Sequence, residues 1–217
     1  MFAYIGAAIF GGYRDVHTSR EVKAAVPLML SHSLVIGYHG CDQKIVERVV
    51  SGKDDLKASQ NDWDWLGHGI YFWEDSHGRA LRWAKEEARQ RNPKIKKPAV
   101  LGAVIDSGNC LNLADTDALA LVNSAHQAYK ELCAKSGVAM LKNHGSELKA
   151  RFLDCVVVET LHELRRQENK EAFDTVRGFF LEGRELYSGA GFRELYHIQI
   201  CVRSPKQIIG YFLPRNG

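Results

Sequence analysis

Two short stretches decide the fold: residues 34–40 read LVIGYHG, and residues 69–73 read GIYFW. Each is rich in β-branched and aromatic residues and is marked by glycine, a pattern that predicts a short strand next to a turn. A helix follows each one. Asp42 can cap the first helix, and Asn92-Pro93 ends the second, which we expect over residues 78–91.

The rest of the chain alternates between short strands and longer helical patterns. We expect strands at 98–105, 195–202 and 207–212, helices at 114–136 and 145–167, and an ordered glycine-rich loop at 173–194. No regular strand–helix–strand rhythm is present, which favours an α+β fold with antiparallel strands over a parallel α/β fold. We expect one domain over residues 34–217, preceded by an N-terminal extension over residues 1–33.

Composition narrows the class of protein without identifying it. The 217 residues include 45% hydrophobic and 25% charged residues, with a net charge of +3, as in an ordinary globular protein. The five cysteines form no C-x-x-C pair, and His39 and Cys41 have no second pair of ligands, so we expect a reduced, cytoplasmic protein without a metal. No apolar run is long enough for a membrane span, and no membrane partner is expected.

The order and spacing of these motifs resemble the ADP-ribosyltransferases of the diphtheria-toxin and poly-ADP-ribose-polymerase class, the His-Tyr-Glu class. In that family, one strand ends in His-Gly and a second carries Gly-Ile-Tyr-Phe, followed after seven residues by a helix that begins with alanine, here Ala80. A third strand ends near Gly-Asn, here Gly108-Asn109. The last catalytic strand carries an acidic residue eight positions before Gln-hydrophobic, here Gln207-Ile208. The resemblance covers about residues 35–215.

The resemblance implies a split antiparallel β-sandwich with inserted helices, which binds NAD⁺ as a substrate in the cleft between two small sheets. His39 would hydrogen-bond a ribose hydroxyl, and the backbone of Gly40 would pair with the nicotinamide amide. Tyr71 would stack on the nicotinamide ring. Tyr38, Gly69 and Trp73 would complete the NAD⁺ pocket, although core packing explains Tyr38 and Trp73 equally well.

The sequence departs from the family at Gln199, which stands where the family has its catalytic glutamate. Glutamine can hydrogen-bond a ribose hydroxyl, but it is neutral and a very poor base. Three explanations remain open: an acceptor that needs little activation, another group that supplies the charge, or an inactive protein. The candidates for that group are Glu182, Glu185, Glu194 and His197. His197 would face the same side of a strand as Gln199.

The resemblance predicts transfer of ADP-ribose to a macromolecule, by an intracellular toxin or anti-phage effector that an antitoxin could restrain. RNA is the favoured acceptor, because a base amine needs no strong base and because aromatic and arginine residues accompany the motifs. These residues are Trp63, Trp65, Arg177, Arg184 and Arg193. A solvated loop explains the arginines equally well, and packing against the strand explains the tryptophans slightly better. The alternatives are a protein acceptor, a non-catalytic NAD⁺ or ADP-ribose reader, and a 2′-phosphotransferase acting on RNA.

Overall fold

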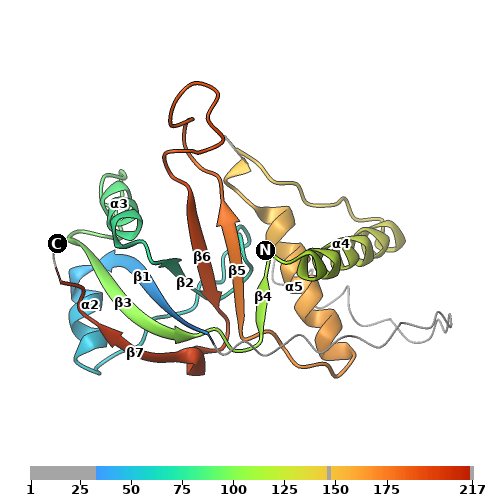
Figure 1. The fold of residues 1–217 in the computed structure, drawn as a ribbon. Helices are drawn as coiled ribbons and strands as arrows, with labels where there is room; N and C mark the ends of the chain where they lie inside the picture. The colour runs from blue at the N-terminus through green and yellow to red at the C-terminus, as the bar shows by residue number, and fades with distance from the viewer. Residues whose placement is uncertain (1–32, 146–147, 216–217) are drawn as a thin grey trace.

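A computed structural model describes residues 33–145 and 148–215 (Figure 1). The predicted extension therefore lies outside the described residues, apart from Ser33. The helices are α2 (Gln43–Val50), α3 (His77–Glu87), α4 (Thr116–Ser136) and α5 (Phe152–Gln167). The strands are β1 (Leu34–Asp42), β2 (Ile70–Glu74), β3 (Pro98–Asp106), β4 (Cys110–Asn112), β5 (Thr175–Phe180), β6 (His197–Val202) and β7 (Ile208–Phe212).

The described strands form one sheet in the order β4-β5-β6-β2-β1-β3-β7. Every neighbouring pair is antiparallel except β4 and β5, which run parallel. The α+β class is confirmed. The expectation of two separate sheets is wrong, because β1 and β2 are joined through the pairs Gly37–Glu74 and Tyr38–Trp73. Beyond these two pairs, β1 continues to pair only with β3 and β2 only with β6, so the sheet splits between β1 and β2 there.

Helices cover both faces of the sheet, and consecutive residues of β2 show how the faces are assigned. Tyr71 packs with the core beneath α4 and α5, whereas Phe72 packs with the core that α2 covers. Trp73 returns to the first face and packs with Ala80 and Trp83 of α3. Figure 1 shows α3 near one end of the sheet and α4 with α5 near the other. Because strand side chains alternate, α3, α4 and α5 share one face.

Local chemistry explains where two helices start and stop. The Asp42 carboxylate accepts a hydrogen bond from the Lys44 amide, which confirms the predicted cap of α2. The same carboxylate accepts from the amides of Lys96 and Lys97, which ties the start of β3 to the end of β1. Gly137 ends α4 in the left-handed conformation that glycine adopts without strain.

Three expected boundaries are wrong. The helix expected over residues 78–91, with its end at Asn92-Pro93, already ends at Glu87. The helix expected from residue 145 begins at Phe152, because His144 and Ala150 pair as an isolated bridge first. The segment expected as loop from residue 173 contains β5, whose Gly178 disguises a strand. A side chain at Gly178 would collide with Leu66, so the glycine permits close packing here. The three-residue strand β4 was not predicted.

Candidate active site

His39 lies where the β1–β2 ladder ends. Its Nδ1 is 2.8 Å from the carbonyl oxygen of Tyr71, so the side chain connects the two strands just beyond their last backbone pair. The ring stands edge-on to Phe72, with 5.8 Å between ring centroids. Burial lowers the pKa of His39, and the hydrogen bond to Tyr71 opposes this only in part. His39 is therefore neutral at pH 7.

Tyr71 is held firmly by the loop that precedes its strand. Its hydroxyl donates to the carbonyl oxygen of Gly67 at 2.6 Å and accepts from the amide of Leu66 at 2.8 Å. Burial raises the pKa of the phenol well above its ordinary value. The hydroxyl is thus fully used within the protein, and only the ring is available for stacking.

The two glycines assigned to the NAD⁺ pocket are in close contact with protein atoms. A side chain on Gly40 would collide with the Ala80 carbonyl of α3, and one on Gly69 would collide with Cys201 and Val202. Both positions require glycine because neighbouring chain segments approach closely. The sequence expectation attributed the close approach at Gly40 to a ligand, whereas the structure places α3 there.

Gln199 lies opposite Trp73 on one side and Gly178 on the other. Directly paired residues share a face, so Gln199 faces the same side as Trp73 and as its strand neighbour His197. Tyr38 pairs with Trp73 across the short ladder and shares this face. The structure therefore brings Tyr38, Trp73, Gln199 and His197 onto the face that carries α3, whereas the His39 ring turns toward Phe72.

A polar cluster forms beside these residues, and it consists of Trp73, Arg79, Glu182 and His197. Arg79 Nη2 is 2.7 Å from Glu182 Oε2, and both side chains are only 12% exposed. The same Glu182 oxygen is 3.8 Å from His197 Nδ1. The guanidinium of Arg79 lies 5.7 Å from the ring centroid of Trp73. The cluster joins α3 to the loop between β5 and β6, which in Figure 1 rises above the ends of these two strands.

Several nitrogen atoms of this cluster are buried and have no hydrogen-bond partner within the described part of the chain. They are Trp73 Nε1, Arg79 Nε, Arg79 Nη1 and His197 Nε2. His197 Nδ1 is 2.7 Å from the Leu195 carbonyl oxygen, so Nδ1 carries the proton and Nε2 is left as an acceptor. Burial lowers the pKa of His197, and the nearby charge of Arg79 adds to this. The cluster therefore offers three donors and one acceptor to a polar ligand.

The other acidic candidates lie outside the cluster. Glu185 is exposed and accepts a hydrogen bond from the Gly189 amide. Glu194 pairs with Arg184, whose side chain is 87% exposed. Of the loop carboxylates considered from sequence, Glu182 alone enters the cluster. Arg79 was missed, because an arginine in the first turn of a helix normally indicates a solvated surface.

The predicted acceptor arginines and tryptophans are engaged in separate contacts. Arg177 makes a two-pronged ion pair with Glu74, with N–O distances of 2.6 and 2.8 Å. Arg193 donates to the Gly183 carbonyl oxygen. Trp65 donates to the Lys149 carbonyl oxygen, and Trp63 stands edge-on to Phe152. These arginines order the loop and the sheet rather than converge on one phosphate position.

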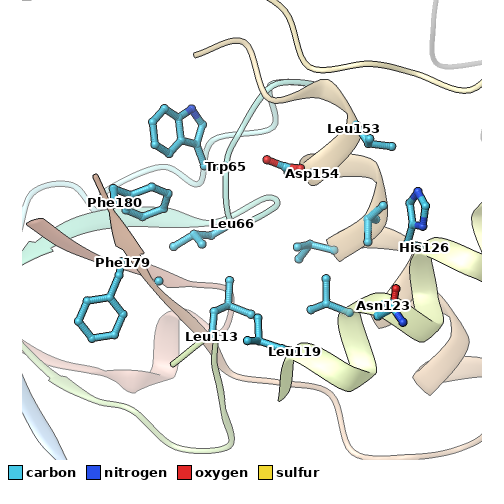
Figure 2. Close-up of a pocket in the computed structure, with 14 residues that line it drawn as sticks. Trp65, Leu66, Leu113, Leu119, Asn123, His126, Leu153, Asp154, Phe179 and Phe180 are labelled. Carbon is cyan, nitrogen blue, oxygen red and sulfur yellow. The ribbon is translucent and has the colours of Figure 1, made fainter. Parts of the chain in front are cut away.

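An apolar groove of about 510 Å³ adjoins the cluster, between β5, α4 and α5 (Figure 2). Most of its lining is aliphatic or aromatic, with Asn123, His126 and Asp154 as the polar members. Phe180 belongs to both regions. Its ring stacks on His197 at 5.3 Å and packs against Trp65 at 4.5 Å, so it forms the wall between the groove and the cluster.

The comparisons with known proteins identify a distant relative but no family. "Uncharacterized protein MJ0359" of Methanocaldococcus jannaschii is 26% identical over 198 residues, which cover 83% of this chain and 87% of the relative. No family model matches the chain, and no solved structure matches it. Within the described residues, no group of His, Cys, Asp and Glu side chains is placed to hold a metal ion. No helix in that part of the chain is long and apolar enough to cross a membrane.

Proposed function

We propose that the protein is an NAD⁺-dependent ADP-ribosyltransferase with the fold of that family. The observation that carries the proposal is the adjacency of the three motif strands. β1 with His39, β2 with Tyr71 and β6 with Gln199 are far apart in sequence but are neighbours in the order β6-β2-β1. The resemblance requires that adjacency, whereas the composition of the chain does not.

The polar cluster gives the proposal a second, independent support. Buried nitrogen atoms without partners cost about 1–3 kcal/mol each, and a bound ligand can remove that cost. A dinucleotide carries hydroxyl, carbonyl and phosphate oxygens that accept hydrogen bonds from Trp73 and Arg79. The nicotinamide end would lie along the face of Tyr38, Trp73 and Gln199, with His39 at the split between β1 and β2.

The test is cleavage of NAD⁺ that is labelled in its adenosine part, with free nicotinamide measured in parallel. RNA, DNA and protein are supplied in separate reactions, and we expect nicotinamide release together with label on RNA. Label confined to protein would overturn the RNA assignment and leave the transferase standing. The absence of both nicotinamide release and transfer with every pool would overturn the enzymatic proposal.

A second candidate function is a non-catalytic reader of NAD⁺ or ADP-ribose, and the observation that favours it is the neutral Gln199. Titration of NAD⁺ and ADP-ribose by calorimetry distinguishes the two functions. A reader binds without releasing nicotinamide, whereas a transferase consumes the titrant.

For either function, Trp73→Phe removes one hydrogen-bond donor and keeps an aromatic ring at this position. We expect it to weaken binding about tenfold, the equivalent of one hydrogen bond, while Trp83→Phe changes it little.

A further inference from the structure

We propose that Glu182 supplies the catalytic carboxylate that β6 lacks at Gln199, and that Arg79 positions it. The inference rests on the proposed transferase function. It resolves the choice that the sequence leaves open between Glu182, Glu185, Glu194 and His197. It also assigns to the β5–β6 loop a catalytic group that acts on the same substrate as the strand motifs.

The position of Glu182 is fixed from three sides. Arg79 binds its carboxylate at 2.7 Å, and His197 Nδ1 lies 3.8 Å from the same oxygen. The backbone carbonyl oxygen of Glu182 accepts a hydrogen bond from the Leu195 amide at the start of β6. His197 and Gln199 are two positions apart on one face, about 6.6 Å along a strand. The carboxylate is therefore held beside the face that Gln199 occupies.

Stability gives a poor explanation for this arrangement. Removing a carboxylate and a guanidinium from water costs several kcal/mol per ion, and well-packed apolar side chains often serve as well. Arg79 has two further nitrogen atoms, Nε and Nη1, that are buried and lack partners in the described structure. A pair designed for stability would satisfy these atoms. Their burial without partners indicates a site completed by a ligand.

The chemistry needs one carboxylate, and Glu182 can perform both of its tasks. The bond between ribose C1′ and the nicotinamide nitrogen breaks, and its electron pair leaves with nicotinamide. The negative charge of Glu182 stabilises the positive ribose that forms. The acceptor oxygen or nitrogen then bonds to C1′, and its proton passes to the Glu182 carboxylate. Gln199 hydrogen-bonds a ribose hydroxyl throughout and keeps the sugar in place.

The experiment compares Glu182→Gln with the wild-type protein and with Glu163→Gln. The control also removes a carboxylate from an ion pair, the one with Arg166 on the surface of α5. We expect Glu182→Gln to lower kcat for NAD⁺ cleavage at least 100-fold while KM changes less than threefold, because the amide retains the hydrogen bond to Arg79. Glu163→Gln should behave like the wild type.

A rescue experiment separates catalysis from loop positioning. Adding Gln199→Glu to Glu182→Gln returns a carboxylate to the same face from β6, and we expect at least a tenfold recovery of kcat. A purely structural role for Glu182 gives no recovery. The proposal is overturned if folded Glu182→Gln keeps kcat within threefold or is not improved by Gln199→Glu. If the wild-type protein itself cleaves no NAD⁺, the proposed function fails instead.

Discussion

Two regions on the face of the sheet that carries α3, α4 and α5 are lined by opposite kinds of side chain. The polar cluster gathers Trp73, Arg79, Glu182 and His197, with buried nitrogen atoms that lack partners in the described structure. The groove between β5, α4 and α5 is lined mainly by apolar side chains. Phe180 contacts both regions, and in Figure 2 its ring lies beside Trp65.

The difference indicates a division of function between the two regions. Unsatisfied polar groups in a low-dielectric site have strong electrostatic effects on whatever binds there, so the cluster is suited to chemistry. An open apolar groove offers contact area with few directional groups, so it is suited to holding part of a larger molecule. Four sets of mutations test this division, and they follow in order of expected effect.

Arg79→Met should have the largest effect, because it leaves Glu182 buried without its cation. We expect NAD⁺ cleavage to fall about 100-fold and the free energy of unfolding to fall by roughly 2 kcal/mol. Arg82→Met on the same helix is the matched control. Arg82 pairs with Glu86 in solvent, where such pairs contribute about 0.3–0.5 kcal/mol. Equal activity in the two variants would show that the cluster is only structural.

Phe180→Ala removes the ring that contacts both regions, and it should have the second-largest effect. The ring loses its contacts with both Trp65 and His197, and we expect a loss of about 2–3 kcal/mol in urea unfolding because the side chain is only partly buried. Phe179→Ala is the control, since that ring is 43% exposed. In Figure 2 it points away from Phe180. If Phe180→Ala lowers the free energy of unfolding no more than Phe179→Ala does, Phe180 does not separate the two regions.

Strand periodicity and turn signals were sufficient to predict β1, β2 and β3 and the cap of α2. They failed at β5, where Gly178 and Arg177 break the apolar pattern. Both residues have tertiary reasons that no local window contains: Leu66 leaves no room for a side chain at Gly178, and Glu74 pairs with Arg177. The split between β1 and β2 likewise depends on pairing between distant segments.

The candidate site was only partly predictable for a similar reason. The sequence predicts Trp73, Gln199 and His197 as site residues, and alternation along a strand correctly places Gln199 and His197 on a common face. The sequence does not predict Arg79 as a site residue, because its ion pair is with Glu182, in a loop about a hundred residues further along the chain. The sequence also could not reveal that the Tyr71 hydroxyl is occupied by Leu66 and Gly67.

Acid should destabilise α5, which forms one side of the groove, through His162, with an effect of intermediate size; His162 packs against Phe173 and does not itself line the groove. Burial and the charge of Arg203 lower the pKa of His162 to about 4, below the ordinary 6.5 of the unfolded chain. Between pH 6.5 and 4 the unfolded state binds more protons, so stability falls as pH falls, by at most about 1.4 kcal/mol per pH unit from this group. His162→Phe should flatten that slope in urea unfolding across the window. An unchanged slope would show that other groups control acid stability.

Leu119→Gln places a neutral polar group at the rim of the groove and should have the smallest effect on the fold. Leu119 is 48% exposed, so we expect the free energy of unfolding to change by less than about 0.5 kcal/mol. Leu119 is on α4, across the Phe180 wall from the cluster, so cleavage of NAD⁺ in the absence of an acceptor should be unaltered. Transfer to the macromolecular acceptor should fall about fivefold to tenfold, the equivalent of losing one apolar contact of roughly 1 kcal/mol. Leu141→Gln, at a similarly exposed position outside the groove lining, is the control. If the rates of NAD⁺ cleavage and of transfer fall together, the groove and the cluster act as one site. If neither rate changes, the acceptor binds elsewhere and the proposed division of function is wrong.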